Sequence, residues 1–241
     1  MIRFDEVQLR FGDHVVLDGV TLDVPDGSTT VLLGRSGAGK SVLLKQVVGL
    51  IRPTAGAVWV DDLRVDTLDR EALVPLRRQV GYVFQFAALF DSMTCAENLR
   101  LGLVRQGLGE GEIAERVGAA LAMVGLADVG ERFPAELSGG MRKRVGIARA
   151  VALRPRYILW DEPTTGLDPV TTATMDLLIQ RVARDLGVTS VVVTHDLRSA
   201  FTVGDRIALL HEGRIRAHGT PDEIRASEDP VVRQFIEGRP E

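Results

Sequence analysis

The chain has 241 residues, is 45% hydrophobic and carries a net charge of −4, which allows one domain with a large core and weighs against a basic nucleic-acid or membrane-binding face. Its single cysteine, Cys95, excludes an internal disulfide. The N-terminus lacks the apolar core of a signal peptide and no apolar run approaches the roughly 18 residues needed to span a bilayer, so we expect a cytoplasmic protein.

Two kinds of strand pattern occur along the chain. The first 30 residues and the segment 56–65 have the pattern of a separate antiparallel sheet, whereas the apolar runs 29–34, 157–162 and 190–195 predict buried strands. Each buried run ends in a polar residue at its carboxyl end, which is the edge where open α/β sheets bind ligands. Since helical patterns alternate with these runs, we expect an α/β fold with a mainly parallel sheet.

Between residues 85 and 156 the pattern changes to helices alone. Apolar residues recur at helical spacing, as at Ile113, Val117 and Leu121. We interpret 85–156 as a helical subdomain inserted into a core formed by 1–84 and 157–222, within one domain. An ordinary helical layer would give the same spacing.

Turn and capping signals mark the last third of the chain. Asp168-Pro169 predicts the start of a helix that runs to Gly187. A hairpin turn is predicted at Glu212-Gly213, and Thr220-Pro-Asp-Glu223 has the form of a capping box. Residues 223–241 are then expected to form a terminal helix and tail.

The strongest chemical motif is Gly34-Arg-Ser-Gly-Ala-Gly-Lys-Ser41, which matches G-x-x-x-x-G-K-[ST] between a predicted strand and a predicted helix. Its glycines let the backbone wrap a phosphate chain, and the following helix adds its N-terminal N–H groups. We expect Lys40 to reach the β- and γ-phosphates and the Ser41 hydroxyl to bind Mg²⁺. The motif predicts the nucleotide site of a P-loop NTPase.

A second motif, "YILWDEP" at 157–163, delivers two carboxylates to the sheet edge. Asp161 is suited to hold Mg²⁺ through its water shell. Glu162 is placed to orient and deprotonate an attacking water. Two acids after a strand could also merely cap the next turn, but the phosphate loop favours the catalytic interpretation. Gln85, His195 and Asp168 follow strands or turns near the same edge.

The Ser138-Gly-Gly140 turn opens a predicted helix and is a second anion site. Because the chain already has a phosphate loop, this turn is surplus within one copy. We expect it to complete the nucleotide site of a second copy, with two chains facing head to tail.

Lysine is rare: three of the 29 basic residues are Lys, namely Lys40, Lys45 and Lys143, and the others are Arg. Such a bias suggests that a retained Lys marks a place where a planar guanidinium does not serve. The sequence assigns a role to Lys40 alone. The basic run Arg142-Lys143-Arg144 is interpreted as a solvated helix face.

Taken in order, the motifs make the whole chain resemble the ATP-binding subunit of an ATP-binding cassette (ABC) transporter. They are the phosphate loop, Gln85, "LSGG" at 137–140, "YILWDEP", "TGLD" at 165–168 and His195. The resemblance implies a RecA-like P-loop core with an antiparallel β subdomain and an inserted α-helical subdomain. It also implies ATP and Mg²⁺ as ligands, ATP hydrolysis, and a homodimer held by an integral-membrane permease at the cytoplasmic face of the inner or plasma membrane.

The same resemblance assigns roles to residues. It gives catalysis to Lys40, Gln85, Glu162 and His195, and Mg²⁺ binding to Ser41, Gln85 and Asp161. The residues implied to bind the nucleotide are Phe11, Val16, Gly34, Arg35, Ser36, Gly37, Ala38, Gly39, Lys40, Ser41, Ser138, Gly139, Gly140 and Asp168. Among these, Phe11 aligns with the aromatic that stacks on adenine. Met141 departs from the pattern, because many members have a hydrogen-bonding Gln after LSGG.

Three segments narrow the resemblance to the ATPase of Mla/Mce-type phospholipid transporters: "FQFAALFDSMTCAENL" (84–99), "LSGGMRKRVGIARA" (137–150) and "DPVVRQFIEG" (229–238). This likeness implies a lipid cargo, a permease contact near residues 89–93, an MCE-domain lipid-binding protein and an accessory subunit. Core packing is the alternative role for the apolar residues at 89–93. Three other functions stay open: an ABC importer ATPase for another solute, a non-transport ABC protein, and a scaffold that does not hydrolyse ATP.

Overall fold

The computed structural model describes residues 1–239, which form two compact units. The first unit combines Met1–Val74 with the C-terminal part of the chain from Thr189 onward, and the second is Pro75–Val188. The second unit is wider than the helical segment 85–156 expected from the sequence, because it also includes two strands and a long helix. Residues 240–241, the end of the expected tail, lie outside the described residues.

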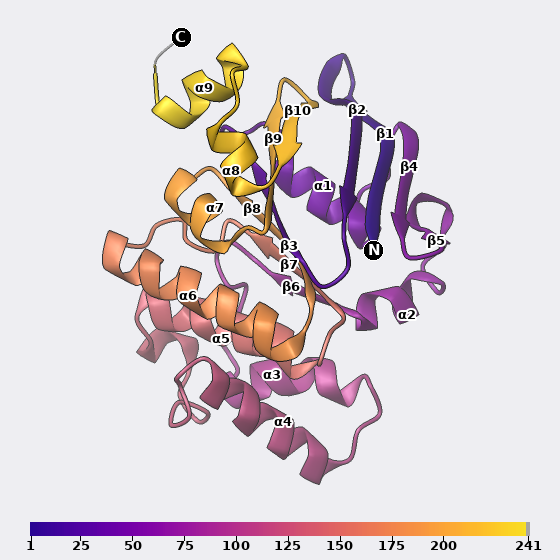
Figure 1. Ribbon diagram of the computed structural model, residues 1–241. Helices are drawn as coiled ribbons and strands as arrows, with labels where there is room; N and C mark the ends of the chain where they lie inside the picture. The colour runs from indigo at the N-terminus through magenta and orange to yellow at the C-terminus, as the bar shows by residue number, and fades with distance from the viewer. Residues whose placement is uncertain (240–241) are drawn as a thin grey trace. The chain divides into compact units, whose positions relative to one another are not determined.

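The first unit contains an antiparallel sheet near the N-terminus, drawn in indigo to purple in Figure 1. Its strand order is β2-β1-β4-β5. The strands are β1 (Ile2–Phe11), β2 (His14–Val24), β4 (Ala55–Val60) and β5 (Leu63–Arg64). Phe4, Val7 and Leu9 are buried while Asp5 and Glu6 are exposed, so one face of the sheet packs on the core.

The other strands of the first unit follow the order β10-β9-β3-β8. They are β3 (Thr29–Leu33), β8 (Thr189–Thr194), β9 (Arg206–His211) and β10 (Arg214–Gly219). All pairs are parallel except β9–β10. Every residue of β3 and β8 is buried, which agrees with the unbroken apolar runs that predicted them.

Helix α1 lies between the two groups of strands and contacts both β4 and β8. The helices of this unit are α1 (Lys40–Val47), η1 (Val65–Thr67), α7 (Leu197–Val203), α8 (Pro221–Arg225) and α9 (Pro230–Glu237). The predicted capping box is confirmed at the start of α8, where Thr220 accepts a hydrogen bond from the Glu223 N–H and Glu223 accepts one in return.

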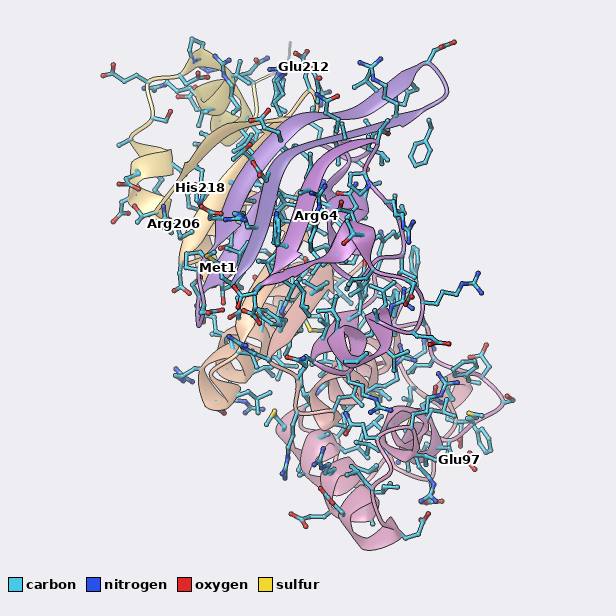
Figure 2. All side chains as sticks on the ribbon, turned by 90° about the vertical axis from the view of Figure 1, so that its right-hand side faces the viewer. Met1, Arg64, Glu97, Arg206, Glu212 and His218 are labelled. Atoms are coloured by element: carbon cyan, nitrogen blue, oxygen red, sulfur yellow. The ribbon has the colours of Figure 1, made fainter. Side chains whose placement is uncertain are left out.

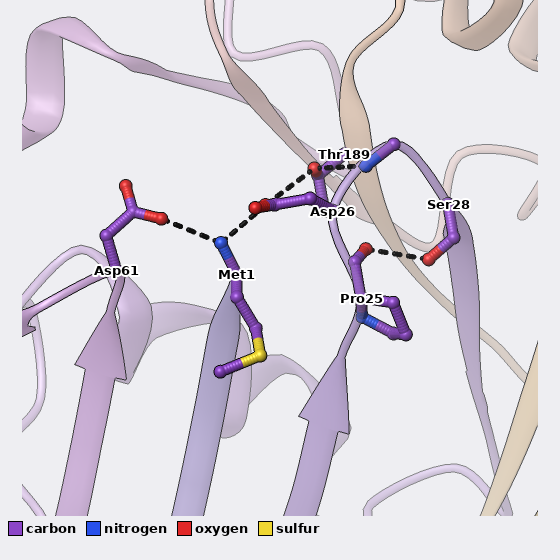
Figure 3. A network of polar contacts seen from close by, with 7 residues as sticks. Met1, Pro25, Asp26, Ser28, Asp61 and Thr189 are labelled. Atoms are coloured by element: carbon purple, nitrogen blue, oxygen red, sulfur yellow. Dashed lines mark hydrogen bonds and ion pairs between the residues drawn. The ribbon is translucent and has the colours of Figure 1, made fainter.

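Polar contacts tie the edges of the first unit together (Figure 3). The Met1 ammonium donates to Asp26, before β3, and to Asp61, after β4, the latter at 2.7 Å. The hydroxyl of Thr189, at the start of β8, accepts a bond from the Gly27 N–H at 2.9 Å. These contacts join the antiparallel sheet to the parallel strands at one end.

The β9–β10 hairpin turns at Glu212-Gly213, as predicted. Across it, the Arg206 guanidinium donates to His218 Nε2 at 3.2 Å (Figure 2). Burial, followed by the positive charge of Arg206, lowers the pKa of His218. The imidazole is therefore held in its neutral, accepting form.

The second unit holds the parallel strand pair β6 (Val80–Val83) and β7 (Tyr157–Asp161) and most of the helices. In chain order the helices are α2 (Leu73–Arg78), which begins at the boundary, α3 (Cys95–Val104), α4 (Glu110–Met123), η2 (Pro134–Glu136), α5 (Gly139–Ala152) and α6 (Pro169–Leu186). Helix α5 packs against β6, α3 and α4. A Cβ at Gly81 would lie 3.1 Å from the Ala150 carbonyl oxygen, so this glycine allows α5 to approach β6 closely.

The predicted limits of α6 are confirmed. Asp168 caps it by accepting hydrogen bonds from the N–H groups of Val170 and Thr171, and Pro169 occupies the first helical position. Gly187 ends the helix in the left-handed conformation, with φ 60°.

Candidate functional site

The phosphate loop joins β3 to α1 in the first unit. Gly34 has no room for a side chain, because a Cβ there would lie 2.5 Å from the Leu210 carbonyl oxygen of β9. Gly37 and Gly39 have φ of 81° and 98°, a region that glycine adopts without steric cost. The three glycines are therefore required by the shape of the loop.

Lys40 lies within this loop. Its ammonium donates to the carbonyl oxygens of Gly34 and Arg35 at 2.8 and 2.9 Å, and its side chain is buried. The following residue, Ser41, is half-buried in the first turn of α1. The loop thus has a compact cation and a hydroxyl at the N-terminus of a helix, the arrangement that binds a phosphate chain.

An open pocket of about 390 Å³ lies against the loop, and Val16, Gly37 and Ala38 are among the residues that line it. A Cβ at Gly39 would lie 3.1 Å from a Val16 methyl group, so β2 packs directly on the loop. Phe11 is 56% exposed at the end of β1. Phe11 does not line this pocket, but an exposed aromatic ring is a group on which a nucleotide base stacks, and Val16 packs beside the loop.

His195 joins the same edge of the first unit. Strand β8 pairs in parallel with β3, and Thr194 lies opposite Leu33 in the register. Gly34 and His195 therefore follow the ends of two neighbouring strands, and His195 is exposed there. The first unit brings together the predicted loop residues, Val16 and His195.

The second unit carries the two carboxylates at the end of β7. Asp161 and Glu162 are 7% and 8% exposed. The Tyr82 hydroxyl, from β6, donates to Asp161 Oδ2 at 3.0 Å. Burial and the negative charge of Asp161 raise the pKa of Tyr82, so the phenol keeps its proton for this bond.

Glu162 has an unusual backbone conformation for a residue with a side chain. Its φ is 48°, in the left-handed region. The Thr165 hydroxyl donates to Glu162 Oε2 at 3.0 Å, and the Thr165 N–H donates to the Glu162 carbonyl oxygen at 3.3 Å. A sharp turn after β7 thus fixes the carboxylate, as expected for a residue that must orient a reactant.

Gln85 follows β6 at the corresponding edge of the second unit. Val83 lies opposite Trp160 in the parallel register, so Gln85 and Glu162 each come two residues after paired positions. Gln85 is half-buried. The second unit therefore places an amide and two carboxylates after neighbouring strand ends.

The Ser138-Gly-Gly140 turn caps α5 in the second unit. The Ser138 hydroxyl accepts a hydrogen bond from the Met141 N–H at 3.3 Å, and Gly139 and Ser138 are exposed. A Cβ at Gly140 would lie 3.2 Å from the Thr171 methyl group, which places the turn beside the capped start of α6 and Asp168. Both helix N-termini are thus accessible from one side of this unit.

A protein-family model described as "ABC transporter" matches residues 17–165 of this chain. That segment contains the phosphate loop, the Ser138-Gly-Gly140 turn (called the signature turn from here on) and both carboxylates. The chain belongs to this family.

Known ABC proteins match nearly the whole chain. The methionine import ATP-binding protein MetN of Rhodopseudomonas palustris is 44% identical over 223 residues, which are 92% of this chain and 60% of that protein. The probable ribonucleotide transport ATP-binding protein mkl of Mycobacterium tuberculosis is 41% identical over 239 residues, 99% of this chain and 67% of the relative. The chain thus spans three fifths of the length of the methionine-import relative.

Solved ABC cassettes share the fold. A dimeric ATP-binding cassette in a post-hydrolysis state, bound to ADP and Pi, has a TM-score of 0.83 and 33% identity, and covers 92% of this chain and 99% of its own. The predicted fold, an ABC-type P-loop domain, is confirmed. No helix among residues 1–239 is long and apolar enough to cross a bilayer.

Each unit has oxygen donors of the kind that Mg²⁺ prefers. They are the Ser41 hydroxyl in the first unit, and the Gln85 amide and the Asp161 carboxylate in the second. Within residues 1–239 no group of three or more His, Cys, Asp or Glu side chains could form a metal cage. Mg²⁺ bound by few protein oxygens, with phosphates and water completing its shell, needs no cage.

Sequence analysis missed the side chains that hold the two carboxylates in place. Tyr82 and Thr165 contact Asp161 and Glu162. The run 142–144 is a solvated face in part: Arg142 is exposed, Lys143 and Arg144 are half-buried, and each of the three side chains donates to a backbone carbonyl in the second unit. The scarcity of lysine was the one signal that pointed to Lys143.

Proposed function

We propose that this chain is the ATP-hydrolysing subunit of an ABC transporter, that it works as a homodimer, and that an integral-membrane permease recruits it to the cytoplasmic face of the membrane. The observation that carries the proposal is the phosphate loop at the start of α1, in which Lys40 is buried and bonded to loop carbonyls and three glycines are required by the shape of the backbone. The whole-chain match to ABC subunits supports it.

In this proposal each unit contributes a distinct part of the chemistry. The loop amides and Lys40 bind the β- and γ-phosphates, Phe11 and Val16 accept the base, and Ser41, Gln85 and Asp161 supply oxygens to Mg²⁺. When bound, Mg²⁺ neutralises charge that develops on the phosphates. Glu162 takes a proton from water as its oxygen attacks the γ-phosphorus and ADP leaves, while His195 contacts the transferred group.

The signature turn is assigned to the nucleotide of a second copy. Ser138, Gly139 and Gly140 present an exposed helix N-terminus, and Asp168 lies beside them on α6. A solved cassette of the same fold is a dimer bound to ADP and Pi, which supports a head-to-tail pair here. ATP then shifts the equilibrium toward the closed pair. The size of the shift is set by how much more tightly ATP binds the closed pair than the open one.

Replacing Glu162 tests hydrolysis separately from binding. We expect Glu162→Gln to lower steady-state ATP hydrolysis by at least about 100-fold while leaving ATP affinity within a few-fold, since the amide cannot accept the proton. Glu6→Gln is a matched control: Glu6 also has φ 48° and accepts a bond from a threonine hydroxyl, that of Thr21, at 2.9 Å. Equal losses in both variants would contradict the proposal.

The permease contact is assigned to an open pocket of about 480 Å³ in the second unit, lined by Phe90, Met93 and Leu101, among others. Phe90 is 54% exposed, and the neighbouring Phe86 is 81% exposed. Exposed aromatics beside a pocket of this kind suit an apolar helix end of a membrane partner better than core packing.

The cargo is assigned to phospholipid or another hydrophobic lipid, on the resemblance of segments 84–99, 137–150 and 229–238. The relatives are named for methionine import and ribonucleotide transport, so a small solute is the second candidate. An MCE-domain protein and an accessory subunit are proposed as further partners of the lipid system. The acidic net charge of −4 weighs against a nucleic-acid partner.

Capture from native membranes decides between the cargoes. Tagged Glu162→Gln protein, held closed by ATP, would be isolated with its partners and analysed by mass spectrometry. A multi-spanning permease with an MCE-domain protein and enriched phospholipid supports the lipid motor. A permease with a solute-binding protein and no lipid enrichment supports the solute importer, and ribosomes or repair factors without a permease would contradict transport.

A further inference from the structure

Lys143 lies on α5, one turn after the signature turn, and reaches the segment that follows β7. Its ammonium donates to the carbonyl oxygens of Pro163 and Thr165, at 2.9 and 2.7 Å. Pro163 directly follows Glu162, and Thr165 is the residue whose hydroxyl binds the Glu162 carboxylate. One cation therefore binds two carbonyl groups of the turn that directly follows Glu162.

This turn needs an external support. Glu162 has φ 48°, which is unfavourable for a residue with a Cβ. Bonds within the segment include that of the Leu167 N–H to the Thr164 carbonyl oxygen at 3.2 Å. Residues in such conformations persist only when the surroundings fix them. Lys143 supplies a fixing contact from a different element.

The neighbours of Lys143 serve other segments. Arg142 donates to the Leu137 carbonyl at 2.7 Å, and Arg144 donates to the Val124 carbonyl at 3.4 Å. Of the three basic residues, the lysine alone is directed at the turn after β7. A rotatable ammonium with three donors can satisfy two carbonyls that point into a small space, where a planar guanidinium imposes its own geometry.

The ammonium also acts on Glu162 electrostatically. Burial lowers the pKa of Lys143, and the negative charge of Glu162 opposes that shift. The charged lysine thus belongs to the same partly buried network as the catalytic carboxylate, in which interactions are stronger than at the surface.

We propose that Lys143 is a positioning residue for hydrolysis: it fixes the turn 162–165 so that Thr165 holds the Glu162 carboxylate toward the attacking water. This inference rests on the proposed function. It also joins the start of the signature helix to the catalytic base of the same chain, so a contact made at Ser138 acts on an element that holds Glu162.

The test separates positioning from binding and from folding. We expect Lys143→Met to lower kcat for ATP hydrolysis 10- to 100-fold while KM for ATP changes less than about threefold, because catalysis is sensitive to small displacements of a catalytic group. Lys143→Arg should lower kcat below the wild-type value, but by less than Lys143→Met does, because it keeps the charge but not the compact geometry of the ammonium. Arg142→Met, on the same helix turn but bonded elsewhere, should retain wild-type kcat.

A second variant keeps the inference testable if Lys143→Met folds poorly, which thermal unfolding would reveal. Thr165→Val removes the hydroxyl that binds Glu162 and leaves Lys143 in place. Because both residues act through one carboxylate, the double variant should be little slower than the slower single variant. Multiplicative losses, or a Lys143→Met variant with wild-type kcat, would overturn the inference alone, whereas an inactive wild type would overturn it together with the proposed function.

Discussion

At the scale of single residues, the two carboxylates after β7 are held by hydroxyl donors that belong to no sequence motif. Asp161 receives the Tyr82 hydroxyl at 3.0 Å, and Glu162 receives the Thr165 hydroxyl at the same distance. Hydrogen bonds to charged groups contribute more than neutral ones. The site is therefore specified by the partners of the carboxylates as much as by the carboxylates.

Removing the Tyr82 hydroxyl should raise the Mg²⁺ concentration that ATP hydrolysis requires. Tyr82→Phe leaves Asp161 without one donor, so its carboxylate is less fixed, and we expect the Mg²⁺ concentration for half-maximal hydrolysis to rise about three- to tenfold. Titrating ATPase activity with Mg²⁺ measures this. Tyr157→Phe, at the opposite end of β7, is the control, and equal Mg²⁺ dependence in all three proteins would contradict the prediction.

At the scale of elements, caps and turns encoded by neighbouring residues were predicted correctly, whereas contacts between distant segments were not predicted. The cap at Asp168-Pro169, the stop at Gly187 and the hairpin at Glu212-Gly213 depend on neighbouring residues, and all three are confirmed. The acceptors of Lys143 lie 20 and 22 positions away and are created by the packing of α5 beside the turn after β7. No local pattern encodes such acceptors, so the sequence did not predict that Lys143 is half-buried and bonded.

Neighbouring residues also failed to predict the backbone conformation of Glu162 and the division of the chain into units. The sequence predicted a role as a base for Glu162 from its place after a buried strand, yet nothing in "DEP" predicts a φ of 48°. Likewise the helical periodicity of 85–156 marked the helices, but contacts group β6, β7 and α6 with them. Chemistry follows from residue types, whereas strain and grouping follow from packing.

Two helix caps of the same type allow stability and function to be separated. Asp168 caps α6 and Asp229 caps α9, each accepting two backbone N–H groups before a proline at the first helical position. Replacing either with Ala should lower the denaturant midpoint, because each variant loses a helix cap and one further side-chain bond, from the Thr171 hydroxyl to Asp168 or from Arg216 to Asp229. Only Asp168→Ala should reduce ATP hydrolysis, since only that cap lies beside the signature turn.

Denaturant unfolding and ATPase assays on the two variants check this. If both variants lose hydrolysis in proportion to their stability, Asp168 has no role beyond capping.

At the scale of the whole molecule, the phosphate-binding groups and the carboxylates belong to different compact units. Lys40, Ser41 and His195 lie in the first, and Gln85, Asp161 and Glu162 lie in the second. Hydrolysis by such a chain requires both units to be folded. A chemical probe confined to one unit therefore shows whether that unit is still folded when ATP hydrolysis is lost.

Cys95 provides such a probe for the second unit. It is the single cysteine, its side chain has no exposed surface, and burial raises the pKa of its thiol. We expect an aromatic disulfide reagent to label native protein at least about 100-fold more slowly than unfolded protein, because reaction requires opening and a thiolate. Labelling in urea should follow the loss of ATPase activity, and rapid labelling without urea would contradict the buried position.

The left-handed backbone of Glu162 has a consequence for stability. Glycine adopts that conformation freely, whereas a side chain there costs of the order of 1 kcal/mol. Glu162→Gly should therefore unfold at a higher denaturant concentration than Glu162→Ala, with both inactive; the reverse order would show that the backbone of this residue is not strained. Under the proposed function, position 162 exchanges some stability for the carboxylate that turnover needs.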